Sequence, residues 1–293
     1  DVYKRQVLIC IMAIGAVVRA IAPVLKDKAS DPAVVVMDEK ATNVISLLSG
    51  HLGGANQVTR DIAELLGSNP VITTATDVQN VTALDSLAQS VNGWRPELRE
   101  FIKPFNSYLG SGRTVYFYQE KDWVTDLRGL TLVDEEGLAA VLKGTEPLIL
   151  LTAEKKDIQR ENLALIYPQP YILGVGARKD VAPAVFREGF EEFCQQQGIS
   201  ASEISKIVSI DVKKDEAAIL ALAEELGCPF ETFSKEELSV VADRYPQSEF
   251  VKKTVGVGSA LASADLASQG QVLTERFAKN GCTYALAKAI TKK

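Results

Sequence analysis

The chain has 293 residues, of which 46% are hydrophobic and 24% charged, so it can bury large cores and is long enough for two or three domains of about 100 to 200 residues each. Its 38 acidic and 32 basic residues give a formal net charge of -6, which argues against a nucleic-acid partner because nucleic-acid readers are basic. Four cysteines without a C-x-x-C pair and a single histidine predict reduced thiols, a cytoplasmic location and no metal site of the protein's own.

The first apolar run, residues 7–18, follows two basic residues and therefore looks like a secretory signal. Arg19 in the cleavage region and Pro23 directly behind it argue against secretion, and the run is shorter than the ~20 residues of a membrane-spanning helix. We expect instead a buried strand at 7–13, a turn at Gly15 and then a helix. Because the chain begins with Asp rather than Met, we also expect its natural start to lie upstream.

The following segments alternate between strands and helices. Short apolar runs predict strands at 33–37, 44–48 and 71–73. The apolar spacing within 58–66 predicts a helix that Gly67 ends. Such alternation favours a parallel sheet with helices packed on it. We therefore expect an α/β fold that starts with a parallel-sheet, Rossmann-like N-terminal domain over residues 1–80, truncated at its start.

The pattern changes after this point. Helices are expected at 81–91 and 96–109, and strands at 114–118 and 148–151. Together these elements predict an α/β middle domain over residues 81–168.

A separate α/β C-terminal domain is expected over residues 169–293. Its predicted elements are strands at 171–175 and 207–210 and a helix at 217–226 that Gly227 closes. Phe186, Phe190 and Phe193 share one helix face, which is more typical of a core than of a cofactor platform. Two capping boxes predict further helix starts, Ser200 with Glu203 and Ser234 with Glu237.

A glycine-rich segment, Gly50-His51-Leu52-Gly53-Gly54-Ala55-Asn56, lies between a predicted strand and a predicted helix. Glycines at such a junction allow close backbone approach and leave amides free for an anion. His51 adds a group that titrates near neutral pH. We expect this turn at the carboxyl edge of the sheet with its amides facing a cleft. The alternative is a tight turn with His51 packed nearby, and the pattern leaves both open.

Two further glycine pairs predict turns. Gly174-Val175-Gly176 precedes Arg178 and Lys179, and Gly256-Val257-Gly258 precedes Ser259. The third glycine of a dinucleotide fingerprint is missing from both, so neither predicts a nucleotide site. Arg178 and Lys179 suit ligand carboxylates. The alternative is a solvated basic pair.

Three charged residues near the N-terminus are also candidates. Asp27 could take a catalytic role, and Arg19 could contact a ligand or pair with a local acid. Asp31 lies on the strand-entry side, whereas parallel sheets bind ligands at the carboxyl ends of their strands, so we expect Asp31 to be a turn residue.

No nucleophile is predicted. There is no G-x-S-x-G elbow, and Ser259 has no second histidine to activate it. Cys194 and Cys228 lie in apolar helical segments, which favours buried, inert thiols. Acid/base catalysis by His51 or a carboxylate is therefore favoured over a covalent mechanism.

Five segments carry a family resemblance. They are Arg19-Ala-Ile-Ala-Pro23, Asp27-Lys28 with Asp31-Pro-Ala-Val-Val-Val36, Val44-Ile-Ser-Leu-Leu-Ser-Gly-His51 through Asn56, Leu173-Gly-Val-Gly-Ala-Arg178-Lys179, and Ser248-Glu-Phe-Val-Lys-Lys-Thr-Val-Gly-Val-Gly258. In this order they resemble the cobalt-precorrin-5A hydrolase family of anaerobic cobalamin biosynthesis over nearly the whole chain. Three positions depart from the family pattern, which commonly has a cysteine at Ala177, a glycine at Asp180 and an acidic residue near Ala262.

The resemblance implies opening of the ring lactone of a cobalt-corrinoid intermediate and release of acetaldehyde. It implies His51 or Asp27 as the catalytic acid/base residue. The implied substrate-binding residues are Arg19, Gly50, Gly53, Gly54, Asn56, Gly174, Gly176, Arg178, Lys179, Gly256, Gly258 and Ser259. Cobalt would enter as part of the substrate, with no cofactor or metal held by the protein.

The implied partners are the corrinoid substrate and neighbouring pathway enzymes, without nucleic acid or membrane. A second hypothesis is a non-catalytic corrinoid-binding or channelling protein with the same fold. A third, a nucleotide-binding α/β protein, is weakened by the incomplete glycine fingerprints.

Overall fold

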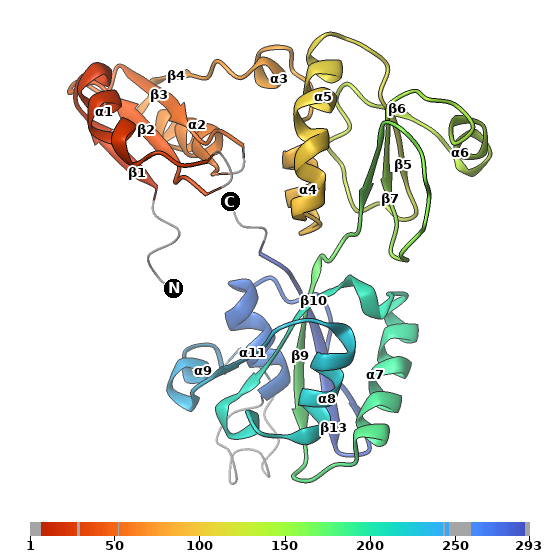
Figure 1. The fold of residues 1–293 in the computed structure, drawn as a ribbon. Helices are drawn as coiled ribbons and strands as arrows, with labels where there is room; N and C mark the ends of the chain where they lie inside the picture. The colour runs from red at the N-terminus through yellow and green to blue at the C-terminus, as the bar shows by residue number, and fades with distance from the viewer. Residues whose placement is uncertain (1–6, 28–29, 52, 243, 246–258, 291–293) are drawn as a thin grey trace.

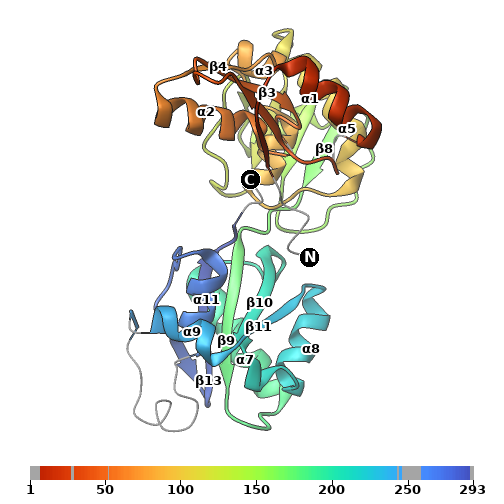
Figure 2. The same cartoon turned by 90° about the vertical axis from the view of Figure 1, so that its left-hand side faces the viewer.

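The computed structural model describes residues 7–27, 30–51, 53–242, 244–245 and 259–290. Its strands form three separate sheets, each accompanied by helices, and the predicted α/β fold is confirmed. We call them the N-terminal unit (sheet within 8–71), the middle unit (116–166) and the C-terminal unit (171–288). The first two lie at one end of the molecule and the third at the other (Figures 1 and 2). The domain boundaries predicted after residues 80 and 168 stay predictions.

The N-terminal unit is a four-stranded sheet with a helix on each face. In sheet order its strands are β1 (Leu8–Ile11), β2 (Val34–Met37), β3 (Asn43–Leu48) and β4 (Asn69–Val71). Its helices are α1 (Ile14–Ile21), the short 3-10 helix η2 (Ala22–Val24) and α2 (Ala55–Leu66). Side chains of β2 alternate between the faces, so Val34 and Val36 pack with Val17 of α1, and Val35 packs against α2.

This sheet is mixed, whereas the sequence pattern predicted a parallel layer. β2 and β3 run antiparallel because a tight turn joins them. In that turn the Asp38 carboxylate accepts hydrogen bonds from the amides of Lys40, Thr42 and Asn43. A parallel connection would need a crossover of roughly a dozen residues or more, which the link 38–42 cannot provide.

The first strand and helix differ from the prediction in burial. β1 forms within the predicted range, but Ile9 and Ile11 are 52% and 59% exposed, so the prediction of a buried strand is wrong. The reason is its position, because β1 is an edge strand with β2 as its neighbour in the sheet. Gly15 lies in the first turn of α1 instead of in a separate turn.

The middle unit has a fully parallel sheet, and both faces of its central strands are covered. In sheet order its strands are β6 (Thr131–Leu132), β5 (Tyr116–Gln119), β7 (Leu148–Leu151) and β8 (Leu163–Ile166). Its helices are α3 (Ala75–Val78), α4 (Leu84–Ser90), η3 (Pro96–Leu98), α5 (Arg99–Gly110) and α6 (Glu135–Val141). Ile149 and Leu151 pack against α4 and α5, and Leu148 and Leu150 face α6.

The C-terminal unit has a five-stranded sheet in which the last two strands are antiparallel additions. In sheet order its strands are β11 (Phe230–Phe233), β10 (Ile204–Ile210), β9 (Tyr171–Ala177), β13 (Cys282–Lys288) and β12 (Phe277–Lys279). Its helices are α7 (Pro183–Gln197), η4 (Ala201–Glu203), η5 (Asp211–Lys213), α8 (Ala217–Leu226), α9 (Lys235–Ala242) and α11 (Ser259–Ser268).

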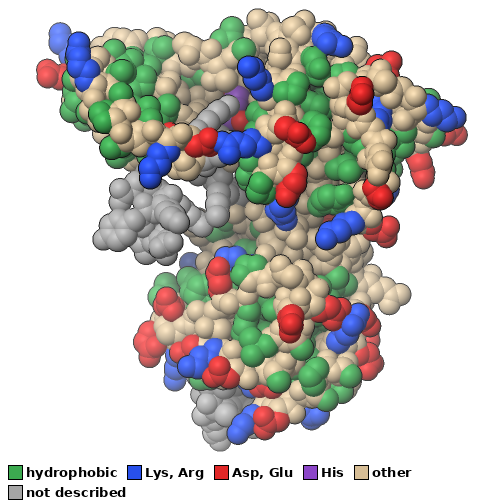
Figure 3. Space-filling view, in the orientation of Figure 1, with side chains coloured by type: hydrophobic (Ala, Val, Ile, Leu, Met, Phe, Trp, Pro, Cys, Tyr) green, Lys and Arg blue, Asp and Glu red, His purple; other side chains and the backbone are tan. Residues whose placement is uncertain are grey.

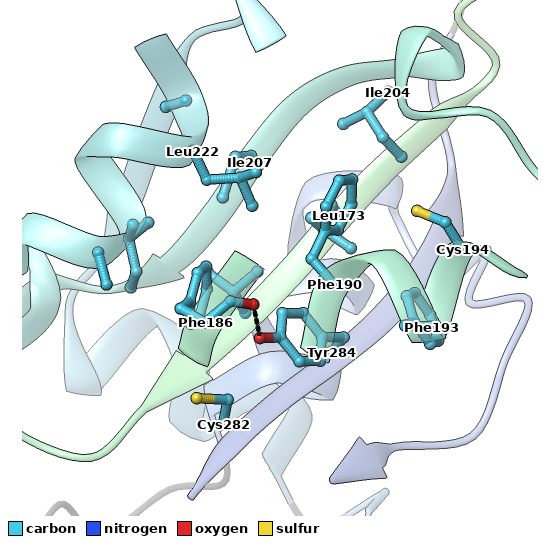
Figure 4. Close-up of a cluster of buried hydrophobic side chains, with 14 of the residues drawn as sticks. Leu173, Phe186, Phe190, Phe193, Cys194, Ile204, Ile207, Leu222, Cys282 and Tyr284 are labelled. Atoms are coloured by element: carbon cyan, nitrogen blue, oxygen red, sulfur yellow. Dashed lines mark hydrogen bonds between the residues drawn. The ribbon is translucent and has the colours of Figure 1, made fainter. Parts of the chain in front are cut away.

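The predicted aromatic stripe belongs to the core of this unit. Phe186, Phe190 and Phe193 are buried on α7. The rings of Phe186 and Phe193 pack against Tyr284 of β13, whose hydroxyl donates to the carbonyl of Phe186 (Figure 4). Both predicted capping boxes form, at the starts of η4 and α9. No helix within the described ranges is long and apolar enough to cross a membrane.

Candidate functional site

The glycine-rich turn lies between the carboxyl end of β3 and the first residue of α2. Gly54 caps α2 with a φ of 84°, a conformation that favours glycine. A Cβ atom on Gly50 would lie 2.6 Å from the side chain of Asn56, and one on Gly53 would lie 2.5 Å from Ser49. The glycines are therefore required by the tightness of the turn.

Three amides of this turn are already engaged. The amide of Gly54 donates to the carbonyl of His51, that of Ala55 to Ser49, and that of Asn56 to Gly50, at 3.0 to 3.2 Å. These three amides are therefore not free to bind an anion, because the turn uses them to start the helix. The side chain of His51 remains as the functional group that the turn presents.

His51 lies between two carboxylates that come from outside its own unit. Its Nε2 is 3.0 Å from Oδ2 of Asp77 on α3, and its Nδ1 is 3.4 Å from Oδ2 of Asp85 on α4. The hydroxyl of Thr76 lies 3.3 Å from Nε2. The side chain of His51 is 9% exposed and that of Asp85 is fully buried.

The Asp77 carboxylate is itself the centre of a polar network. One oxygen accepts from Nδ2 of Asn56 at 2.8 Å, and the other pairs with Arg60 of α2. Asn56 is buried and also accepts a hydrogen bond from Ser46 at 2.6 Å and donates to Thr74 at 3.1 Å. These contacts fix α3 against the N-terminal unit and aim the carboxylate at His51.

The surroundings favour the protonated form of His51. Burial of the ring acts in the opposite direction, but the hydrogen bonds and negative charges of Asp85 and then Asp77 outweigh it and raise the pKa of His51 above its ordinary value. The geometry agrees, because both ring nitrogens face carboxylate oxygens and only the imidazolium donates from both.

Two cavities meet at His51. One, of about 610 Å³, is largely apolar and is lined by His51, Thr74, Ala75, Thr76, Trp94, Arg99, Ile102, Lys103, Asn106 and Ser107. The other, of about 550 Å³, is more polar, and the side chains of Arg60, Asp77, Gln89, Asp126 and Arg128 help to line it. In Figure 3 the purple of the chain's single histidine is visible in the hollow between the N-terminal and middle units. This hollow is the candidate active site.

The remaining candidates of the N-terminal unit have different positions. Asp27 pairs with Arg99 of α5, which lines the apolar cavity, and is not itself among the residues that line either cavity. Arg19 is exposed and donates to the carbonyl of Gly15 in its own helix. Asp31 accepts hydrogen bonds from the backbone amides just before it and is the predicted turn residue.

The first glycine pair of the C-terminal unit is not a turn. Gly174 and Gly176 are buried within β9. A side chain on Gly174 would overlap the carbonyl oxygen of Ala260 in α11, so the close packing of this helix requires a glycine there. The turn prediction is therefore wrong for this pair. Gly256 and Gly258 lie outside the described residues, and Ser259 begins α11.

The basic pair that follows β9 lies in the C-terminal unit, apart from His51. The backbone amide of Arg178 donates to the carbonyl of Gly281 at 2.9 Å. Lys179 lines a third cavity, of about 850 Å³, together with side chains of η5, α8 and α9. The structure thus separates the candidate residues into two groups, one in each end of the molecule.

Among the described residues, neither the thiols of Cys194 and Cys228 nor a cluster of metal ligands forms a second centre. Burial raises the pKa of Cys194 to about 12 and that of Cys228 to about 11, so both thiols stay protonated. The part of the chain that the structure describes contains no group of three or more His, Cys, Asp and Glu side chains that could hold a metal ion.

Sequence reasoning missed the partners of His51. Asp77 lies in a four-residue helix that has no periodic pattern, and Asp85 lies among apolar residues of α4. The available signal was the position of Asp85 between apolar residues, since a carboxylate is rarely buried unless it is paired and therefore indicates a partner. The cations Arg60, Arg99, Lys103 and Arg128 are spread over the chain and meet around the two cavities.

Comparison with known proteins gives matches along both ends of the chain. The family model described as Cobalamin synthesis G N-terminal matches residues 2–77, and Cobalamin synthesis G C-terminus matches residues 171–287. A cobalt-precorrin-5A hydrolase of Salmonella typhimurium is 38% identical over 96% of this chain and 82% of its own. The cobalt-precorrin-5A hydrolase of Priestia megaterium is 32% identical over 94% of this chain and 76% of its own.

A solved structure is also similar. The crystal structure of a candidate cobalamin biosynthesis protein G homologue from Sulfolobus solfataricus covers 96% of this chain and 82% of its own, with 22% identity and a TM-score of 0.43.

Proposed function

The chain belongs to the cobalt-precorrin-5A hydrolase family, and from this premise we propose that it opens the ring lactone of cobalt-precorrin-5A with water and releases the two-carbon fragment as acetaldehyde. The position of His51 is the observation that locates the proposed reaction in the molecule. Its imidazole is held between Asp77 and Asp85 where two cavities meet. A proton carrier in such a hollow is what the reaction requires.

The reaction asks for two opposite proton transfers. In the first step water adds to the lactone carbonyl and releases a proton to solvent, the bond from the carbonyl carbon to the ring oxygen breaks, and that oxygen takes up a proton from His51. In the second step the resulting hydroxyl loses its proton, the carbon-carbon bond breaks, and acetaldehyde leaves while the electron pair stays on the macrocycle. We assign both transfers to His51, which donates as imidazolium and then accepts as imidazole.

The cations around the cavities supply the binding energy for an anionic substrate. Arg99 and Lys103 line the apolar cavity, as does Trp94. Arg60 and Arg128 line the polar cavity. We propose that the flat macrocycle packs against the apolar cavity and that its carboxylate arms pair with these cations, because arginine binds carboxylates through two hydrogen bonds.

The other parts of the functional assignment follow from the substrate. Cobalt enters as part of the corrinoid, and the protein contributes no cofactor of its own. We place the protein in the cytoplasm, with the corrinoid as its small-molecule partner and neighbouring pathway enzymes as the proteins that exchange it.

The test is incubation of the purified protein with the cobalt-corrinoid lactone while acetaldehyde is measured. We expect one acetaldehyde for each lactone opened. Tight binding of the corrinoid with no acetaldehyde would favour the non-catalytic binding protein instead. Loss of acetaldehyde release in a His51 variant that still binds the corrinoid would place the chemistry at the hollow.

A further inference from the structure

We infer that Asp85 is a positioning residue that holds the ring of His51 in its working orientation, so that the middle unit completes a catalytic site whose histidine belongs to the N-terminal unit. This inference rests on the proposed function. Asp85 acts on the reaction through His51 and not directly, because its side chain is fully buried and faces Nδ1 of the ring, whereas Asp77 faces Nε2.

The Asp85 carboxylate is held from behind. Nδ2 of Asn106 on α5 donates to its Oδ1 at 3.1 Å, and Oδ1 of Asn106 accepts from the backbone amide of Leu84 at 2.8 Å. The other oxygen of Asp85 is then directed at Nδ1 of His51. Two helices of the middle unit therefore fix one carboxylate oxygen opposite one ring nitrogen, which is the arrangement that orients a catalytic imidazole.

The charges divide around the ring in a consistent way. On the Nε2 side, Asp77 also pairs with Arg60, and the positive Arg128 acts on it through space. On the Nδ1 side, Asp85 presents its negative charge to His51. Arg99 and Lys103 line the apolar cavity on the same hollow. Removing Asp85 thus takes away a carboxylate that favours the imidazolium, whereas Arg60 already offsets part of the charge of Asp77.

The position of Asp85 gives the middle unit a chemical role. The two family models match residues 2–77 and 171–287, and Asp85 lies between them. Its helix α4 packs on α5 in the core of the middle unit. Any movement of that unit relative to the glycine-rich turn would change the distance from Asp85 to His51, and so the orientation of the ring.

The experiment uses the fact that His51 is the chain's single histidine. Its imidazole gives one set of ring signals in a nuclear magnetic resonance titration of the intact protein. We compare the wild type with Asp85→Asn, Asp77→Asn and the control Asp61→Asn, which removes an exposed carboxylate from α2. In the Asp85 variant, His51 is expected to titrate at a lower pH than in the wild type. The same variant is expected to lose about tenfold or more in kcat with little change in KM. The Asp61 variant should titrate as the wild type does.

An unchanged titration midpoint of His51 in a folded Asp85→Asn protein would overturn the inference. If that variant does not fold, Asn106→Ala serves in its place, because it keeps the charge and removes the group that holds Asp85; here too an unchanged midpoint would overturn it. The titration does not depend on activity. A wild type that releases no acetaldehyde would contradict the proposed function while the link between Asp85 and His51 is still measured.

Discussion

Nζ of Lys121 in the middle unit lies 2.5 Å from Oε2 of Glu203 in the C-terminal unit. The other oxygen of Glu203 accepts from Nε1 of Trp123 at 2.8 Å, and the backbone amide of Ser200 donates to the first oxygen at 2.7 Å. The Glu203 side chain is fully buried. One capping-box carboxylate therefore both starts η4 and ties the two units together.

Replacing Glu203 with alanine should lower the free energy of unfolding by about 1 to 3 kcal/mol, because it leaves the indole N–H of Trp123 and the amide of Ser200 without their acceptor, whereas Lys121 is 38% exposed and can be hydrated. Urea unfolding followed by tryptophan fluorescence measures the loss, since Trp123 is a direct contact. The control is Glu191→Ala, which breaks an exposed ion pair with Arg187 on α7 and should cost less than about 1 kcal/mol. Equal losses in the two variants would contradict a locking role for Glu203.

Substitution of Gly174 should also lower the stability of the protein, for a different reason. Gly174→Ala places a methyl group against the carbonyl of Ala260, so α11 must move away from β9, at a cost of about 1 to 3 kcal/mol or more. The control is Gly15→Ala in α1, where the new methyl group meets only the end of the Arg19 side chain at 3.6 Å. That change should stabilise by about 0.5 to 1 kcal/mol. Thermal melts of both variants give the comparison, and a Gly174 variant as stable as the wild type would show that α11 does not depend on this contact.

Local patterns were sufficient wherever an element buries one clear face or carries a cap. β7 and α8 begin and end at the predicted residues, and both capping boxes form. Burial of β1 was not predictable in the same way. An apolar run reads the same on an edge strand as in the middle of a sheet, because exposure depends on which other segments lie beside it.

The direction of β3 could have been predicted. The link between β2 and β3 contains Asp38, a residue that favours turns, and is too short for a parallel crossover. The site was predictable in part. Sequence patterns identified His51, but its partners Asp77 and Asp85 come from two other helices, and no spacing along the chain encodes a meeting of three elements.

The two basic pairs predict different binding losses. Arg99→Ala with Lys103→Ala should weaken binding of the cobalt-corrinoid by tenfold or more, roughly 1.4 kcal/mol or above, because both side chains line the cavity beside His51. Arg178→Ala with Lys179→Ala tests whether the C-terminal cavity also contributes. We expect weaker binding there as well, with folding unchanged, since solvated charges contribute little to stability. Equilibrium titration of the visible corrinoid absorbance measures both, and a double variant that binds as the wild type does removes that pair from the site.

The raised pKa of His51 predicts a pH dependence of stability. A group whose pKa is higher in the folded state stabilises it fully below the ordinary value of 6.5, and this contribution disappears as the pH rises through the folded pKa. The wild type should therefore lose stability relative to His51→Gln as the pH rises from about 6. Unfolding free energies of both proteins across that range give the difference, and a difference that grows with pH would contradict an imidazolium held by Asp77 and Asp85.

The reaction itself depends most directly on His51. His51→Gln keeps a side chain of similar size that can donate a hydrogen bond to Asp77 or Asp85, so the fold and the corrinoid affinity should be retained. Glutamine cannot carry a proton, so the single-turnover rate of acetaldehyde release should fall about a hundredfold or more. The melting temperature is measured beside the rate, at a pH where the wild type is fully folded. A rate that is unchanged, or a loss that follows unfolding, would show that His51 does not transfer the proton. Asp27 would then be the next residue to replace.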